Sequence, residues 1–133
     1  VVKFIDESYN ASPVSMINAI KYYDDYPLKN NKKKFLILGE MLELGLKKNF
    51  YHKQIIDEVI KTDINFIFFS GKSYEKILKR EKLLSRKNIY YMSAENIMKY
   101  IEYIIHNDDI ILIKSSNATK LNKLSKQLIK RIK

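Results

Sequence analysis

The sequence has no cysteine and no tryptophan, and only three glycines and two prolines among its 133 residues. The lack of cysteine excludes a disulfide framework and thiolate metal sites, and it fits a reducing compartment. No apolar run approaches the roughly 20 residues of a membrane span, and the first residues lack the charged start and long apolar stretch of a signal peptide. With 46% hydrophobic and 30% charged residues, the chain reads as one globular domain, residues 1–133.

Acidic residues are also in the minority. The 25 Lys and Arg residues against 15 Asp and Glu give a net charge of +10, which favours anionic partners such as nucleotides, phosphates, carboxylates or nucleic acid. Much of this excess is explained by a composition rich in lysine, isoleucine and asparagine, so the charge by itself identifies no partner.

Short β-branched or aromatic runs alternate with longer stretches of helical periodicity. The expected strands are residues 1–5, 35–38, 66–69, 89–92 and 110–113. The expected helices are residues 13–23, 49–61, 73–84, 94–106 and 121–132. Continuous apolar strands in series with helices predict an α/β, Rossmann-like fold. We expect an open, mostly parallel sheet of about five or six strands with helices on both faces.

Polar residues follow most of these strands, at 6–10, 39–40, 70–72 and 114–117. In open parallel sheets, ligands bind outside the carboxyl ends of the strands. Two of the three glycines, Gly39 and Gly71, belong to this set, where a backbone must turn tightly or approach a ligand closely. The candidate site is therefore this edge of the sheet.

Several familiar motifs are missing from the sequence. There is no G-x-G-x-x-G fingerprint, no G-x-x-x-x-G-K-[ST] P-loop and no G-x-S-x-G nucleophile elbow. No His, Asp and Glu residues have metal-ligand spacing. The sequence therefore predicts neither a catalytic residue nor a metal ligand within this chain.

Three segments do carry a resemblance. Residues 6–13 read DESYNASP and are followed by Ser15-Met16, residues 38–45 read LGEMLELG and are followed by His52, and residues 113–117 read IKSSN. In order and spacing they resemble the D-[DE]-S-Y-N-A-N-P-x-S-M, L-G-[DE]-M-x-E-L-G…H and V-K-G-S-[RN] segments of the Mur ligases. The resemblance is to the branch that adds D-alanyl-D-alanine.

The resemblance implies the C-terminal domain of a cytoplasmic ligase of peptidoglycan precursor synthesis. Such enzymes use ATP and Mg²⁺ to activate the carboxylate of a UDP-N-acetylmuramoyl-tripeptide as an acyl phosphate, which the amine of D-alanyl-D-alanine attacks. The P-loop and most Mg²⁺ ligands belong to a central domain, and the UDP-sugar site to an N-terminal one. Both are absent from this chain, which starts at Val1 without a methionine, and the central domain is the expected intramolecular partner.

The first segment implies a nucleotide site. Asp6 matches the acidic position at the ATP ribose, and a carboxylate can accept bonds from both hydroxyls. Asn10 matches a position near the adenine and ribose. The alternative for both residues is a polar turn that satisfies backbone groups. Ser12 replaces the usual Asn, a mild change because either residue caps a helix well.

The other two segments imply the D-alanyl-D-alanine site. Lys114 and Ser116 suit the dipeptide carboxylate, and Glu40 and His52 suit orienting the dipeptide or closing against the central domain. The alternatives are a surface lysine for Lys114 and a core or capping histidine for His52. Ser115 replaces the usual Gly, so its β-carbon could narrow a close approach of two backbones.

Three other functions stay open at this stage. The chain could be the C-terminal domain of another Mur or folate-type amide ligase. It could also be a stand-alone nucleotide-binding module, or a basic domain that binds nucleic acid. The absence of a phosphate loop weighs against the module. Residues 114–133 contain seven Lys and Arg residues and no acidic residue, but these alternate with a leucine stripe in an ordinary amphipathic helix. We therefore expect no nucleic-acid partner.

Overall fold

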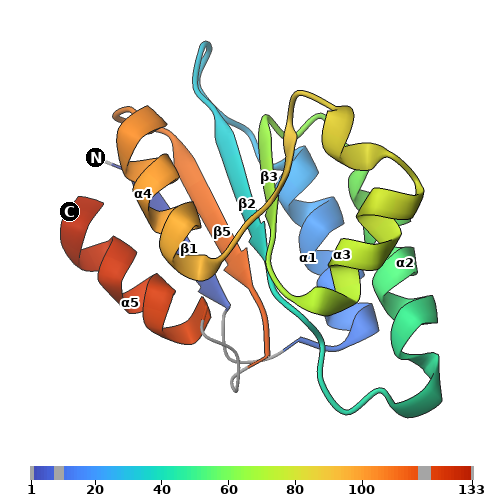
Figure 1. Ribbon diagram of the computed structural model, residues 1–133. Coiled ribbons are helices and arrows are strands. Elements are labelled where there is room, and N and C mark those ends of the chain that lie inside the picture. The colour runs from blue at the N-terminus through green and yellow to red at the C-terminus, as the bar shows by residue number, and fades with distance from the viewer. Residues whose placement is uncertain (1, 8–10, 117–120, 133) are drawn as a thin grey trace.

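In the computed structural model, which describes residues 2–7, 11–116 and 121–132, five strands alternate with five helices (Figure 1). The strands are β1 (Lys3–Glu7), β2 (Lys34–Leu38), β3 (Phe66–Phe69), β4 (Ile89–Tyr91) and β5 (Ile110–Lys114). The helices are α1 (Pro13–Asp25), α2 (Lys48–Val59), α3 (Lys72–Arg80), α4 (Ala94–Ile104) and α5 (Leu121–Ile132), with short 3₁₀ turns η1 (Gly45–Lys47) and η2 (Leu83–Ser85). Each expected strand and helix is confirmed, and most differ from the prediction by a few residues at their ends.

The strands form one sheet in the order β1-β5-β2-β3-β4, and every pairing is parallel. Helices α1, α2 and α3 cover one face, and α4 and α5 cover the other (Figure 1). This confirms the predicted α/β fold, with five strands in the sheet. Because all strands are parallel, their carboxyl ends lie at one edge, at the bottom of Figure 1.

Successive side chains of β1 and β5 point to alternate faces of the sheet, and this determines which helices each polar side chain at the edge faces. Phe4 packs on the core beneath α4 and α5, whereas Ile5 packs on the core beneath α1, α2 and α3. Successive side chains of a strand point to opposite faces, so Asp6 faces α5 and Glu7 faces the opposite side. Lys114 is the register partner of Glu7 and shares its face of the sheet.

The position of β1 corrects the sequence-based expectation. We expected a strand at 1–5 with Asp6 and Glu7 in the following loop, but β1 spans Lys3–Glu7. Its parallel pairing with β5 continues to the pair Glu7 and Lys114. Contact with a strand that is distant in the sequence therefore extends β1 into a polar stretch that local hydrophobicity would end.

The helix starts follow the predicted signals. Ser12 caps α1 in a reciprocal arrangement with Ser15, and Pro13 occupies the first turn. Ser93 caps α4 by accepting a hydrogen bond from the backbone N–H of Asn96. Helix α3 is shorter than the expected 73–84 because Lys82 adopts a left-handed conformation with φ 55°, which an α-helix cannot contain.

Candidate functional site

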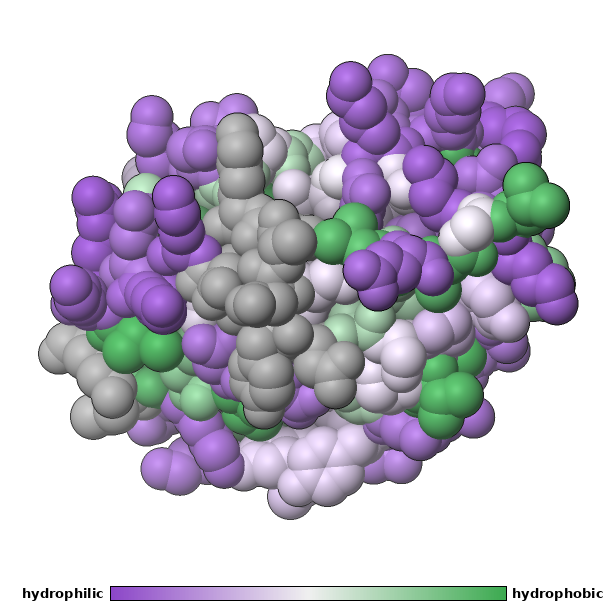
Figure 2. All heavy atoms as spheres, turned by 90° about the horizontal axis from the view of Figure 1, so that it is seen from below, coloured by the Kyte–Doolittle hydropathy of each residue, from purple (hydrophilic) through white to green (hydrophobic). Residues whose placement is uncertain are grey.

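A cavity opens at the carboxyl edge, between the ends of β2, β3 and β4 and the first turns of α3, α4 and α5. Its volume is about 480 Å³. Figure 2 looks onto this edge from below and shows hydrophilic side chains around scattered hydrophobic ones. The polar residues that line the cavity are Glu40, Ser70, Lys72, Tyr91, Ser93 and Glu95. Polar groups around a concave surface at this edge are the usual setting for a ligand in an open α/β sheet.

Glu40 is the predicted site residue that lines this cavity. Its Oε1 accepts a hydrogen bond from the backbone N–H of Ser73 at 3.2 Å, in the first turn of α3, where the helix dipole favours a carboxylate. The side chain crosses Gly71, which has φ +115° and no room for a β-carbon beneath Glu40. The predicted need for glycine at Gly71 thus has two causes, backbone conformation and contact with Glu40.

The segment after β2 is bonded to the segment after β5. The N–H of Gly39 donates to the carbonyl of Lys114 at 2.9 Å, and the N–H of Ser116 donates to the carbonyl of Glu40 at 3.3 Å. The hydroxyl of Ser116 accepts from the N–H of Leu42 at 3.2 Å. Two of the three segments that carry the resemblance therefore form one unit beside the cavity.

The side chain of Ser115 has room at the end of β5 because the residue beside it, after β2, is Gly39. A β-carbon built on Gly39 would lie 2.6 Å from the β-carbon of Ser115 and 2.6 Å from Cδ1 of Leu121. The close approach that the sequence predicted at Ser115 does exist, and the missing side chain of Gly39 accommodates it.

Lys114 is buried in an ion pair. Its Nζ lies 2.8 Å from Oε1 of Glu7, and the Lys114 side chain is 5% exposed against 38% for Glu7. The alternative position that the sequence left open, a surface lysine, is therefore not observed, because β5 continues to Lys114 and places it opposite Glu7. In this arrangement its ammonium group is engaged by a carboxylate of the chain itself.

Asp6 accepts a hydrogen bond from the hydroxyl of Ser125, a fully buried serine of α5. This contact ties the last helix to the carboxyl end of β1 and fixes how the Asp6 carboxylate is turned. Sequence reasoning missed Ser125, although a serine between Leu124 and Leu128 on the apolar face of a helix is the signal that could have revealed it. Asn10 lies outside the residues that the structure describes.

His52 is fully buried and packs edge-on against the ring of Tyr74, with the ring centroids 4.8 Å apart. Its Nε2 lies 3.1 Å from the backbone nitrogen of Met41, and its Nδ1 lies 2.7 Å from the carbonyl oxygen of Lys48. Burial lowers the pKa of the imidazole. Of the two readings that the sequence left open, the geometry matches the core histidine.

Tyr74 is a second residue that sequence reasoning did not single out. Its hydroxyl donates to the carbonyl of Gly39 at 2.9 Å, and burial raises the pKa of this hydroxyl. Tyr91 lines the cavity, and burial together with the charges of Glu75 and Glu40 raises its pKa. Both phenols therefore stay protonated at neutral pH and can act as hydrogen-bond donors.

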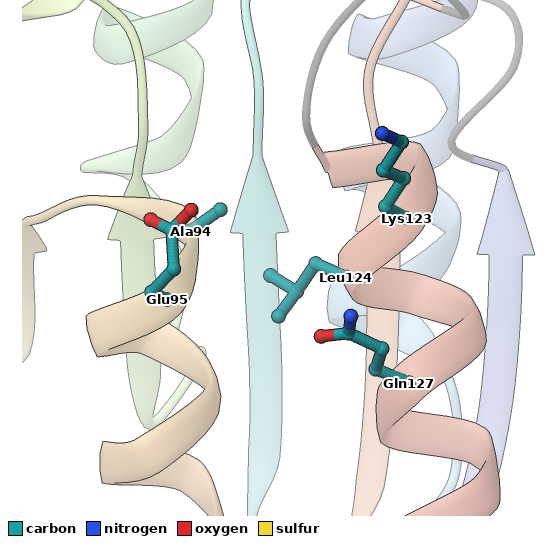
Figure 3. Close-up of a pocket in the computed structure, with 5 residues that line it drawn as sticks. All are labelled: Ala94, Glu95, Lys123, Leu124 and Gln127. Atoms are coloured by element: carbon teal, nitrogen blue, oxygen red, sulfur yellow. The ribbon is translucent and has the colours of Figure 1, made fainter.

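A smaller hollow of about 230 Å³ lies between α4 and α5 and shares Ala94 and Glu95 with the first cavity. Leu124 and Gln127 extend from α5 toward α4, and Lys123 stands at its upper rim (Figure 3). Across the described residues no group of three or more His, Cys, Asp or Glu side chains could hold a metal ion. In the same part of the chain, no helix combines the length and the apolar character needed to cross a membrane.

Comparison with known proteins identifies the family of this chain. Residues 2–117 match the family described as Mur ligase, glutamate ligase domain. The UDP-N-acetylmuramoyl-tripeptide–D-alanyl-D-alanine ligase of Buchnera aphidicola subsp. Baizongia pistaciae is 33% identical over 95% of this chain and 26% of its own length. The ligase of the same name from Bacillus subtilis is 31% identical over 96% of this chain and 28% of its own length.

Solved structures show the same fold. The MurF ligase of Thermotoga maritima in complex with ADP superimposes with a TM-score of 0.73 at 25% identity, over 98% of this chain and 29% of that chain. A MurF structure from Acinetobacter baumannii gives a TM-score of 0.77 at 22% identity, over 96% of this chain and 28% of that one. The present chain spans about a quarter of the length of the curated relatives. From the family match and these likenesses, the chain belongs to the Mur ligase family and represents its glutamate ligase domain.

Proposed function

We propose that the chain is the C-terminal domain of a cytoplasmic ligase that adds D-alanyl-D-alanine to UDP-N-acetylmuramoyl-tripeptide in peptidoglycan precursor synthesis. The observation that carries this proposal is the bonded unit formed by residues 39–42 and 114–116 beside the cavity. Two of the three segments that resemble this branch of the family meet there. Relatives 30–33% identical to nearly the whole chain bear the name of that ligase.

The division of labour follows from which groups this chain holds. In the full-length enzyme, the tripeptide carboxylate would take the γ-phosphoryl group of ATP, with ADP as the leaving group, and we assign most contacts to ATP and Mg²⁺ to the central domain. This chain's residues orient the nucleotide and the incoming amine. Ser125 holds the Asp6 carboxylate in one orientation, ready to accept hydrogen bonds from ribose hydroxyls. Asn10 is proposed, by resemblance, to lie near the adenine.

The cavity beside Glu40 suits a small zwitterionic dipeptide. D-alanyl-D-alanine has an ammonium group, a carboxylate and two methyl groups. The carboxylates of Glu40 and Glu95 are available to the ammonium group, and Lys72 is available to the carboxylate. Gly39, Ala94 and Leu121 supply small and apolar surface, which suits the methyl groups.

Two lysines compete for the dipeptide carboxylate. Lys114 is the residue that the resemblance implies, but it is buried and paired with Glu7. Lys72 is exposed and lines the cavity. A ligand contact by Lys114 would break a buried ion pair and leave Glu7 without its partner, a cost that Lys72 does not have. We therefore assign the carboxylate to Lys72, and Ser116 remains the residue that shapes the adjoining segment.

The test compares Lys72→Met and Lys114→Met in the intact ligase. Lys72→Met is expected to raise KM for D-alanyl-D-alanine about tenfold to a hundredfold, the loss of a charged hydrogen bond of about 1.5–3 kcal/mol. Its KM for ATP should change far less. If only Lys114→Met raises the dipeptide KM, the carboxylate belongs to Lys114 instead.

The same assay tests the activity itself. The wild-type ligase should form product from UDP-N-acetylmuramoyl-tripeptide, ATP and D-alanyl-D-alanine, with the dipeptide preferred over single amino acids. Preference for a single amino acid, or for a folate substrate, would assign the chain to another amide ligase of the family.

A further inference from the structure

In the four residues after β2, Gly39 to Leu42, five backbone polar groups form hydrogen bonds with other parts of the chain. We call these residues the Gly39–Leu42 segment. Lys114 at the end of β5 and Ser116 after it bond three of these groups, and the other two bonds come from α2 and α3. His52 of α2 bonds the N–H of Met41, and Tyr74 of α3 bonds the carbonyl of Gly39.

The hydrogen bonds of His52 define its tautomer. The carbonyl oxygen of Lys48 can only accept, so Nδ1 must carry the proton. Nε2 is then an acceptor, and the partner that faces it is a donor, the N–H of Met41 at 3.1 Å. A protonated ring would present a second N–H to the N–H of Met41 and lose this bond. The arrangement therefore needs a neutral histidine.

The surroundings of His52 agree with this requirement. The charged and titratable groups that face it are Glu40 from the segment after β2, Lys48 from its own helix and Tyr74 from α3. Burial lowers the pKa of the ring and is the largest influence, although Glu40 acts in the opposite direction. His52 therefore remains uncharged at neutral pH.

Glu40 sits between the two anchored residues. Tyr74 bonds the preceding residue, Gly39, and His52 bonds the following residue, Met41. The backbone N–H of Ser73, at the start of α3, donates a hydrogen bond to the Glu40 carboxylate. A shift of either anchor would move the carboxylate away from the cavity wall. The fully buried imidazole itself has no surface to offer a ligand.

We propose that His52 is a positioning residue, which sets the place of Glu40 in the dipeptide cavity through the N–H of Met41, with Tyr74 as the second anchor. This inference rests on the proposed function for the identity of the ligand. It changes the role that the resemblance implies for His52, from contact with the dipeptide to support of the residue that makes the contact.

The experiment uses His52→Leu and His52→Gln in the intact ligase. Leucine removes the acceptor, whereas the side-chain oxygen of glutamine can accept from Met41 without taking up a proton. His52→Leu is expected to raise KM for D-alanyl-D-alanine about threefold to tenfold, the effect of one neutral hydrogen bond, and to leave KM for ATP within about twofold. His52→Gln should restore the dipeptide KM to within about twofold of the wild type.

Two tyrosine variants provide a second test that does not depend on whether the His52 variants fold. Tyr74→Phe removes the hydroxyl that holds Gly39. Tyr23→Phe removes an equally buried hydroxyl that donates to the carbonyls of Phe35 and Ile110, at the opposite ends of the strands. Only Tyr74→Phe should raise the dipeptide KM. Equal effects of the two tyrosine variants, or equal effects on ATP and dipeptide, would overturn the proposal.

Hydrogen exchange of the intact ligase separates this inference from the proposed function. His52→Leu should speed amide exchange in residues 39–44 and His52→Gln should not, whatever the substrate proves to be. Unchanged exchange in His52→Leu overturns the positioning role. Failure of the wild-type enzyme to use D-alanyl-D-alanine overturns the proposed function alone.

Discussion

Two adjacent acidic residues at the end of β1 have different partners because a strand points them to opposite faces. Asp6 meets the buried hydroxyl of Ser125 on α5, whereas Glu7 meets the ammonium group of Lys114 on β5. One carboxylate is therefore oriented by a neutral donor and the other balances a buried cation. This difference makes Asp6 the better candidate for a ligand contact.

Asp6→Asn tests the nucleotide role. In the intact ligase it should raise KM for ATP about tenfold to a hundredfold, which corresponds to about 1.5–3 kcal/mol for a charge-assisted hydrogen bond. The fold should persist because an amide oxygen can still accept from Ser125. Ser125→Ala, which leaves the carboxylate without this donor, should have a smaller effect on the same constant. An unchanged KM in Asp6→Asn, or loss of the fold, would leave Asp6 a structural residue.

The second prediction at the residue scale concerns His52 and how the free energy of unfolding depends on pH. Its folded-state pKa is lowered by burial, whereas the unfolded chain takes up a proton near pH 6.5. The unfolded state therefore binds more protons as the pH falls below about 6.5, and the stabilisation is lost there, by at most about 1.4 kcal/mol per pH unit. Urea unfolding at about pH 7.5 and 5.5 should show a smaller loss of stability for His52→Gln than for the wild type. Equal losses of stability in the wild type and in His52→Gln would contradict this role of the His52 pKa.

At the scale of elements, Gly39, Ser115 and Leu121 pack closely together at the carboxyl edge of the sheet. This contact joins the end of β2, the end of β5 and the first turn of α5, and it leaves no space for a β-carbon on Gly39. The same contact places the segments after β2 and β5 beside each other, so packing and the candidate site depend on one glycine.

Gly39→Ala should therefore destabilise the chain by about 1–3 kcal/mol through overpacking. Ser115→Gly in the same chain removes one of the two clashes and should recover part of this loss, since residues in contact couple by about 0.5–3 kcal/mol. Chemical unfolding of the two single variants and the double variant measures the coupling. Strictly additive effects would show that the two residues do not compete for this space.

At the scale of the whole molecule, both faces of the sheet are covered by helices of this chain. One core lies beneath α1, α2 and α3, and a second lies beneath α4 and α5. Strands buried on both faces in this way need no additional domain to shield them. The sequence, however, contains no P-loop with which to bind the phosphates of ATP.

We therefore expect the chain to fold alone and to release no phosphate from ATP. Purified by itself, it should unfold in one cooperative transition in urea. In the presence of ATP, Mg²⁺ and both proposed substrates it should show no phosphate release, with the intact ligase as the positive control. Clear turnover by the chain alone would contradict the assignment of catalysis to the central domain.

The order of strands and helices could be predicted because hydrophobic periodicity and capping are local properties. The runs at 66–69 and 121–132 appear in the structure with the predicted bounds, and Ser12 and Ser93 cap the helices that follow them. The end of α3 could not be predicted in this way, because Lys82 leaves the helical conformation without a glycine or proline to mark it.

What the sequence by itself determined is the fold class, the edge that carries the candidate site and the family to which it points. Tertiary structure alone decided what each polar side chain contacts. Lys114 meets Glu7, Asp6 meets Ser125 and His52 meets Met41, in two cases across more than a hundred residues of sequence. The physical reason is that hydrophobic periodicity is set by neighbours along the chain, whereas hydrogen bonds and ion pairs depend on strand order, register and face, which exist only once distant segments pack together.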